Sequence, residues 1–387
     1  MRARGLLHRR RTALCTSLTA AAACAAAALA APAFAPLQIY AVGAEGQSVA
    51  IADVTGDGHA DVLLTDNTRL FVFHGSAGGS LAKPVVLPLA GPGSTEWNAG
   101  IAVADLNRDG RADVAVADKS GVRLFVQRRG RFAPSRDIAL PFAAEEVTAA
   151  DLNGDRRPDL VVSGRIEQTT TPELYLLVNG RSGWHAQKID DFWSMAICIG
   201  DVNGDGHPDI VPLPPGTTAT PSVRLYLGDG RGSFVRRDIQ VASQPVDAPS
   251  ALAVGDVTGD HRADLVFVNE INSPRSHLAV MAGGSSGSLA APTLYPSHDN
   301  PDAVAIADLN GDRRNDVAVL HGGFKELGIY YQGLSGTLGA EQLIGIPYST
   351  RYDPNALAIG NLDAGRHSDI AIADDGYTKG LLVLRQP

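Results

Sequence analysis

Seven nine-residue segments of the chain carry side-chain oxygens at alternate positions. In Asp201–Asp209 these oxygens come from Asp201, Asn203, Asp205 and Asp209, at positions 1, 3, 5 and 9, and glycine stands where the chain must fold back on itself. Calcium takes roughly six to eight oxygen ligands, which a short loop can deliver when every second residue points inward around a tight turn. The segment therefore predicts a loop that binds a hard divalent cation.

The same segment recurs along the chain at intervals of 46 to 55 residues. Self-similarity at a nearly fixed period is typical of repeat architectures. The seventh copy, Asn361–Asp369, lacks the carboxylate at position 5, so we expect weak or no binding there. Turns without metal are the alternative interpretation, because Asp and Asn favour turns in any case. We expect calcium in the other six copies, with these side-chain ligands: Asp53, Thr55, Asp57, Asp61, Asp105, Asn107, Asp109, Asp113, Asp151, Asn153, Asp155, Asp159, Asp201, Asn203, Asp205, Asp209, Asp256, Thr258, Asp260, Asp264, Asp308, Asn310, Asp312 and Asp316.

Positions 6 and 7 of the segments also follow a pattern. Position 6 is glycine in three copies, where a positive φ costs little, and Arg156, His261 or Arg313 in three others. We expect these larger residues to strain or reshape the turn. Position 7 is basic in every copy. We expect its backbone carbonyl to face the ion and its cationic side chain to lie outside, where it partly offsets the aspartates.

Short apolar stretches surround each segment and must position it. Val49–Ala52 precedes the first copy and Val62–Leu64 follows it, so the segment is expected to be the turn of a hairpin. A third stretch, Arg69–Phe73, ends near a glycine-rich turn, and a fourth opens with the bulky Leu81. Four strands per period with turns between them make one propeller blade.

The two ends of the chain complement each other. The seventh repeat stops after its third strand, Leu381–Leu384, while Phe34 and Ile39 have the same five-residue spacing as Phe234 and Ile239 in a fourth strand. We expect residues 34–40 to complete the last blade, because closing the ring removes exposed sheet edges. The sequence thus predicts an all-β fold, a seven-bladed β-propeller of four-stranded blades closed by the N-terminal strand.

The strand–loop–strand unit, with glycine-rich turns such as Gly228–Gly232 and a following Phe234, resembles the FG-GAP or VCBS repeat of the integrin α-chain type of propeller. The resemblance covers nearly all of residues 34–387. It implies a seven-bladed propeller with calcium bound through positions 1, 3, 5 and 9 and through the carbonyl of position 7. It says little about the task of the protein, because a fold does not fix function.

The first 33 residues have the features of an export signal. Five arginines precede an alanine-rich run, Ala13–Ala31, and small residues offer cleavage after Ala30 or Ala33. We therefore expect a single propeller over residues 34–387 in an exported protein, whether secreted, periplasmic or on the cell surface. The route is open between general and twin-arginine export, as is lipidation at Cys24. No later stretch approaches the roughly 20 apolar residues that a membrane span needs.

The net charge and the cysteine content restrict the kind of partner and the means of stabilisation. The 387 residues have a formal net charge of −9, and removal of the five signal-peptide arginines makes it −14. Such an acidic chain argues against nucleic acid as a partner. Cys198 is the only cysteine after residue 33, so no internal disulfide can form, and metal ions are an alternative means of stabilisation.

The links between blades on the face opposite the metal loops are expected to hold most of the exposed aromatic and polar side chains. Aromatic rings beside carboxylates and amides suit sugars, whose C–H faces stack on rings while their hydroxyls seek polar groups. We expect a carbohydrate or protein ligand there, although a single tryptophan can equally cap a blade. The candidate ligand-binding residues are Trp97, Glu146, Asp191, Trp193, Asp299 and Tyr352.

A catalytic interpretation has weaker support. Gly283–Gly287 matches G-x-S-x-G, but it falls in a strand-to-strand turn and not in the strand-to-helix corner of a nucleophile elbow. We assign no catalytic residue and favour a binding or adhesion module. The alternative is a polysaccharide lyase or hydrolase that pairs Glu145 or Glu146 with Asp190, Asp191 or Asp299, as glycosidases pair carboxylates.

Overall fold

The computed structural model divides into two units, Met1–Ala31 and Pro32–Pro387. Its described residues all belong to the second unit, so the export-signal prediction lies outside them. They are residues 34–89, 99–166, 169–213, 222–240, 249–269, 272–284, 288–347, 354–363, 365–376 and 378–386.

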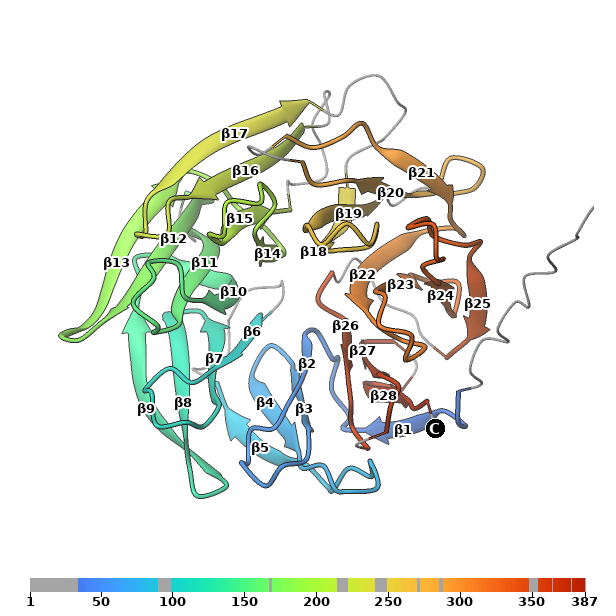
Figure 1. Ribbon diagram of the computed structural model, residues 1–387. Coiled ribbons are helices and arrows are strands. Elements are labelled where there is room, and N and C mark those ends of the chain that lie inside the picture. Colours follow the sequence, from blue (N-terminus) through green and yellow to red (C-terminus); the bar gives the residue numbers. More distant parts are fainter. Residues whose placement is uncertain are drawn as a thin grey trace, which may run out of the picture. The chain divides into compact units, whose positions relative to one another are not determined.

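The second unit is built from seven four-stranded antiparallel sheets (Figure 1). Six sheets take their strands in chain order, from the inside of the ring outward. Blade 1 is β2 (Val49–Ala52), β3 (Asp61–Thr65), β4 (Arg69–Phe73) and β5 (Val85–Pro88); blade 2 is β6 (Ile101–Ala104), β7 (Asp113–Asp118), β8 (Gly121–Arg128) and β9 (Arg131–Ala139); blade 3 is β10 (Ala143–Ala150), β11 (Asp159–Ile166), β12 (Thr171–Gly180) and β13 (Gly183–Asp190).

The next three blades follow the same plan. Blade 4 is β14 (Ile197–Gly200), β15 (Asp209–Pro212), β16 (Ser222–Gly228) and β17 (Phe234–Gln240); blade 5 is β18 (Pro249–Gly255), β19 (Asp264–Asn269), β20 (His277–Met281) and β21 (Thr293–Pro296); blade 6 is β22 (Pro301–Ala307), β23 (Asp316–His321), β24 (Glu326–Tyr330) and β25 (Gln342–Gly345). Blade 7 combines β26 (Leu357–Gly360), β27 (Asp369–Asp374) and β28 (Gly380–Leu384) with β1 (Gln38–Ala41) from the start of the chain.

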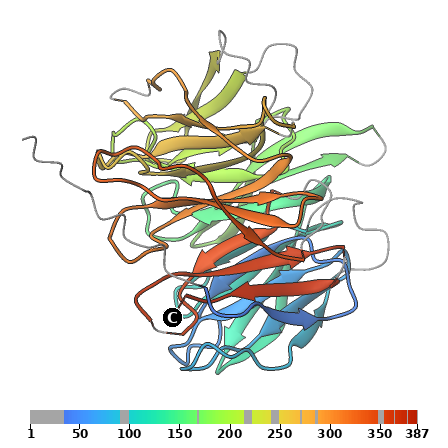
Figure 2. The same cartoon turned by 90° about the vertical axis from the view of Figure 1, so that its right-hand side faces the viewer.

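Strand β1 closes the ring, as the sequence predicts. It pairs antiparallel with β28, with Gln38 opposite Val383 and Ala41 opposite Gly380. The innermost strands contact one another in sequence around the ring, and β26 returns to β2. Figure 2 shows the C-terminal strands (red) beside the N-terminal ones (blue). The predicted seven-bladed propeller is therefore confirmed.

Small residues on the inner strands allow the blades to converge. A Cβ added to Gly360 would lie 2.7 Å from Ile51 Cγ2 of blade 1, and one added to Gly200 would lie 2.5 Å from Val254 Cγ1 of blade 5. The core lies between adjacent blades, where the second and third strands are almost wholly buried. Phe73, for example, packs in one cluster with residues of blades 6 and 7. This packing fixes the loops at the end of every inner strand.

Across the described ranges no helix is long and apolar enough to cross a membrane.

Candidate metal loops and ligand-binding face

A buried aspartate anchors the loop of every blade. The side chains at position 9 have no exposed surface: Asp61, Asp113, Asp159, Asp209, Asp264, Asp316 and Asp369. In blade 4, Asp209 Oδ2 accepts the Val202 N–H at 3.0 Å and Oδ1 accepts the Gly228 N–H at 2.8 Å. Equivalent pairs of hydrogen bonds occur in blades 1, 3, 5, 6 and 7. The carboxylate therefore ties the loop to the end of the third strand.

Burial has an electrostatic cost at this position. It raises the pKa of Asp159, Asp209 and Asp316 to about 6, against the lowering effect of their backbone hydrogen bonds. The carboxylates at positions 1 and 5 raise these pKa values further. A cation among the carboxylates would stabilise the charged forms.

The first half of each loop folds around the aspartate at position 1. In blade 4, Asp201 Oδ1 accepts the Gly204 N–H at 2.7 Å and Oδ2 accepts the Gly206 N–H at 2.8 Å. The position 6 amide is bound in this way in all six intact loops. Asp205 Oδ1 at position 5 accepts the His207 N–H at 2.9 Å. The oxygens of positions 1 and 5 are thus held on the inner side of one turn.

The turn keeps its shape in the three intact loops where position 6 is not glycine. Arg156, His261 and Arg313 have φ values of 63°, 64° and 68°, in the same left-handed region as the 82–85° of the glycines at that position. The expected reshaping therefore does not occur, because the carboxylate at position 1 holds the amide of position 6 in every case. The larger residues carry the expected backbone strain, about 1–2 kcal/mol each.

The seventh loop is organised differently. Asn361 Nδ2 donates to the Gly365 carbonyl at 2.6 Å, and Gly365 N–H donates to Asp363 Oδ1 at 2.8 Å. An amide donor therefore points into the loop where the other copies have a carboxylate. Asp369 is still buried and accepts the amides of Leu362 and Gln386, so its role in joining the strands does not depend on a metal.

The intact loops have the chemistry that a hard cation requires, since the expected side-chain ligand atoms at positions 1, 3, 5 and 9 are all oxygens. Thr55 Oγ1 and Thr258 Oγ1, at position 3, are buried beside position 9 carboxylates without a hydrogen bond of ordinary geometry. In the described part of the chain, however, no three His, Cys, Asp or Glu side chains are already gathered at one metal position. The carboxylates at positions 1 and 5 instead accept loop amides.

A cavity of about 430 Å³ lies at the centre of the ring, lined by inner-strand residues of all seven blades. Glu146 borders it near the start of β10, at the end of the strand away from the metal loop, and is only 5% exposed. Asn355 Nδ2 donates to Glu146 Oε2 at 2.8 Å and to the Met195 carbonyl at 3.0 Å. Two polar side chains from blades 3 and 7 thus meet at the cavity, on the face opposite the metal loops.

Cys198 also borders the central cavity. Burial raises the pKa of its thiol to about 12, and the charge of Glu146 acts in the same direction. A thiol with such a pKa is neutral at physiological pH and is a poor nucleophile. Its expected role as a small core residue agrees with this environment.

Trp193 is held in place by two charged residues. Its Nε1 donates to Glu145 Oε2 at 2.5 Å, and the Arg165 guanidinium lies over its ring, 4.4 Å from the ring centre. Arg165 Nε also donates to Glu145 Oε1 at 2.9 Å. Burial raises the pKa of Glu145, and its bonds to Arg165 and Trp193 oppose the rise. The half-buried indole is therefore fixed close to the residue that precedes Glu146.

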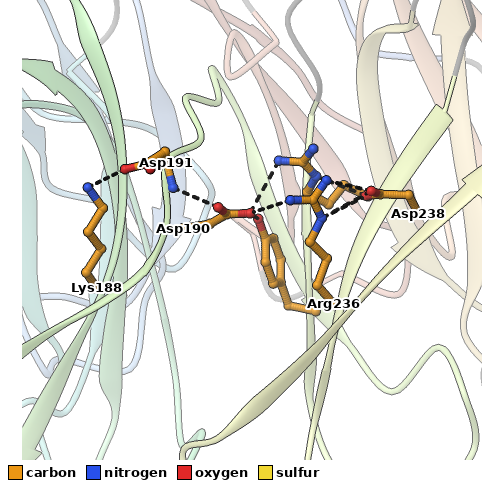
Figure 3. Close-up of polar contacts among 7 residues, drawn as sticks. Lys188, Asp190, Asp191, Arg236 and Asp238 are labelled. Atoms are coloured by element: carbon orange, nitrogen blue, oxygen red, sulfur yellow. Dashed lines mark hydrogen bonds and ion pairs between the residues drawn. The ribbon is translucent and has the colours of Figure 1, made fainter.

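Asp190 and Asp191 belong to an ionic network on the outer strands of blades 3 and 4 (Figure 3). Asp190 Oδ2 accepts the Tyr226 hydroxyl at 2.7 Å and lies 3.2 Å from Arg236 Nη1. Asp191 pairs with Lys188 at 2.5 Å and its side chain is 72% exposed. These two carboxylates therefore join strands and blades and do not face Glu146.

Asp299 lies in another part of the ring, in the link between β21 and β22. It accepts the Ser273 N–H, and this bond holds its pKa below the usual value. Trp97 and Tyr352 lie outside the described residues. The structure thus holds Trp193 close to Glu145, the neighbour of Glu146, whereas Asp191 and Asp299 make other contacts. The carboxylate pairing considered for a hydrolase is not found among the described contacts.

Sequence reasoning missed two residues on the face opposite the metal loops, Asn355 as the partner of Glu146 and Arg165 as the cation over Trp193. Their partners lie 209 and 28 residues away along the chain, so no local spacing indicates them. An isolated arginine at the end of a second strand was the only signal for Arg165.

Comparison with known proteins agrees with this architecture. Residues 53–116, 105–162 and 201–267 match the FG-GAP-like repeat. A T-cell immunomodulatory protein homolog of Plasmodium yoelii yoelii is 28% identical over 132 residues, which are 31% of this chain and 19% of that protein. The chain therefore matches about a fifth of the length of this relative.

Three solved structures share the fold at low sequence identity. A lectin of Agrocybe aegerita that recognises non-reducing terminal N-acetylglucosamine superposes with a TM-score of 0.56 at 19% identity, covering 86% of each chain. A protein of unknown function from Desulfotomaculum acetoxidans gives 0.56 at 12% identity, covering 83% of this chain and 90% of that one. The Dos1 propeller gives 0.50 at 13% identity, covering 90% and 80%. With its repeats and its closed ring of seven blades, this chain is an FG-GAP repeat β-propeller.

Proposed function

We propose that the protein is an exported, calcium-stabilised propeller that binds a carbohydrate or protein ligand on the face opposite the metal loops, with no catalysis of its own. The observation that carries the binding role is the central cavity with the Glu146–Asn355 pair at its border. A concave site with a few fixed polar groups is the usual form of a ligand pocket, and 430 Å³ lies within the usual range of sizes.

A carbohydrate is the ligand class that this face suits best. The carboxylate of Glu146, which Asn355 holds at the cavity, offers an acceptor for hydroxyl groups, and the Trp193 indole lies close to the neighbouring Glu145. The lectin with a similar fold is a precedent for sugar binding on such a propeller. It supports the class of ligand but not the position of the site.

Calcium would stabilise the ring when bound in the six intact loops. It would be held by the oxygens of positions 1, 3, 5 and 9, and its charge would offset the carboxylates whose pKa values burial raises. The Asn361 amide that points into the seventh loop supports weaker binding there. Calorimetry on chelator-stripped protein tests this role, and an absence of calcium uptake would contradict it.

Ligand binding is tested with a glycan array followed by calorimetry on the best sugar. Glu146→Gln and Asn355→Ala should each weaken binding about tenfold, the loss of about 1.4 kcal/mol that one good polar contact gives. Glu45→Gln is a matched control, because Glu45 is exposed and pairs only with Lys379 at 3.1 Å among the described contacts. Unchanged binding by both variants would overturn the site, and new reducing ends or unsaturated products from polysaccharides would overturn the non-catalytic role.

A further inference from the structure

A second cavity, of about 520 Å³, lies between the outer strands of blades 5 and 6. Tyr295 and Pro296 of β21 line one side, and Tyr330 of β24 and Glu341 line the other. Ser297 also lines it; this side chain is 6% exposed, and its Oγ has no hydrogen bond of ordinary geometry. We call this cavity the blade 5–6 groove. It is separate from the central cavity of the proposed function.

The corresponding region between blades 3 and 4 is filled by an arginine. Arg224 of β16 lies with its guanidinium 4.3 Å from the centre of the Phe192 ring and 3.4 Å from Asp190 Oδ2. The Tyr226 hydroxyl donates to the same Asp190 oxygen at 2.7 Å. Asp190, the last residue of β13, thus receives an arginine and a tyrosine from the next blade.

Blades 1 and 2 have a similar arrangement. Arg123 of β8 donates through Nη1 to the carbonyl of Pro88, the last residue of β5, at 3.1 Å. Its Nε and Nη2 bind the two oxygens of Asp137 at 3.0 and 2.9 Å. The arginine again crosses to the end of the preceding blade.

Blade 6 has a glycine where blades 2 and 4 have these arginines. Arg123, Arg224 and Gly328 each stand four residues before the amide that donates to the position 9 aspartate of their blade. Tyr330 keeps the role of Tyr226, since its hydroxyl donates to the carbonyl of Pro296, the last residue of β21, at 2.9 Å. The blade 5–6 groove therefore keeps the acceptor and the tyrosine but has no arginine of its own.

The Glu341 carboxylate fills the space beside Gly328. A Cβ built on Gly328 would lie 2.1 Å from Glu341 Oε1, so the glycine is what lets the Glu341 side chain pass. Glu341 Oε1 lies 2.9 Å from Nε2 of the fully buried His321, and Oε2 accepts the His298 N–H at 2.7 Å. Glu326 lies 3.2 Å from His298 Nδ1 and adds a second carboxylate to the surroundings.

We propose that the blade 5–6 groove binds the guanidinium group of an arginine side chain presented by a polypeptide partner. Glu341 and the Pro296 carbonyl supply acceptors, and the ring of the half-buried Tyr295 supplies a wall on which a planar cation packs. The bound group corresponds to the guanidinium ends of Arg123 and Arg224, which reach the last residue of the preceding blade. Because guanidinium is planar and donates in a fork, it fits this setting better than an ammonium group does.

The test is calorimetry on the full chain with N-acetyl-arginine methylamide as the probe. The citrulline analogue has the same shape without the charge, and the lysine analogue has the charge without the planar fork. We expect both to bind at least about tenfold more weakly than the arginine probe, the difference that corresponds to about 1.4 kcal/mol. Equal binding of either analogue, or no binding of the arginine probe, would overturn the assignment.

Two variants locate the site. Glu341→Gln removes the charge and should weaken binding about tenfold. Gly328→Arg installs the arginine of blades 2 and 4 and should abolish binding; its Cβ would lie 2.1 Å from Glu341 Oε1, so the substitution also displaces the Glu341 carboxylate. Thermal unfolding checks that both variants are folded, and Glu45→Gln serves as the control. Wild-type affinity in a folded Gly328→Arg protein would refute the proposal, whereas sugar binding at the central cavity tests the proposed function independently.

Discussion

The aspartate at position 9 has two roles that a pair of substitutions can separate. Asp209 in blade 4 and Asp369 in blade 7 are both fully buried, and each accepts one amide from its loop and one from the end of the third strand. Only Asp209 belongs to a loop in which we expect calcium. Asp209→Asn and Asp369→Asn therefore remove the same strand-joining contact with and without a metal role.

The size of the structural effect follows from the hydrogen bonds. Asparagine keeps one acceptor, so each variant loses one bond to a charged group, worth about 1.5–3 kcal/mol. The new amide group also faces a buried backbone N–H, which adds about 1–3 kcal/mol. We expect Asp369→Asn to destabilise the protein by about 3–5 kcal/mol, in calcium and in EGTA alike.

Urea unfolding in calcium and in EGTA measures both roles. In calcium, Asp209→Asn should lower the free energy of unfolding more than Asp369→Asn does, because it also weakens the binding of an ion that binds only the folded state. In EGTA its cost should be smaller, since the substitution removes a carboxylate whose pKa burial raises to about 6. The reasoning is refuted if Asp369→Asn is neutral, or if Asp209→Asn costs the same in both buffers.

Three further outcomes are expected. Without calcium, carboxyls such as Asp159 bind protons more strongly in the folded than in the unfolded state, because burial raises their pKa to about 6. The urea concentration at the midpoint of unfolding in EGTA should therefore decrease as the pH is raised from 5 to 7. In calcium this decrease should not occur. Asp190→Asn should cost about 1–2 kcal/mol by urea unfolding through its bond to Tyr226, and a Tyr226→Phe background should remove most of that cost. Gly360→Ala should lower the free energy of unfolding by about 1–3 kcal/mol, because its Cβ would lie 2.7 Å from Ile51 Cγ2. Ile51→Ala should relieve this clash, so that Gly360→Ala costs less in the Ile51→Ala background. Equal costs of Gly360→Ala in both backgrounds would contradict the contact.

The fold was readable from the sequence because it depends on local signals that repeat. The aspartates in each copy mark a turn, apolar stretches on both sides mark strands, and the number of copies fixes the number of blades. Even ring closure left a signal, since Phe34 and Ile39 repeat the spacing of a fourth strand that the last blade lacks.

The ligand-binding face was less predictable because its contacts join distant blades. Asp191 precedes inner strand β14 and Glu146 lies near the start of inner strand β10, but Asp191 pairs with Lys188 on its own blade, whereas Glu146 meets Asn355 at the central cavity. Which way a link residue points depends on the packing of neighbouring blades, and no spacing within one repeat records it.

The sequence by itself determined the repeat, its strands and the oxygen donors of each loop, because these follow from residue types a few positions apart. Only the tertiary structure decided how the carboxylates are used. Asp369 persists in a loop that lacks the carboxylates of positions 1 and 5 because it joins two strands in a buried site. Glu341 reaches His321 because Gly328 leaves room for it. Both outcomes arise from contacts between strands and links that the ring brings together.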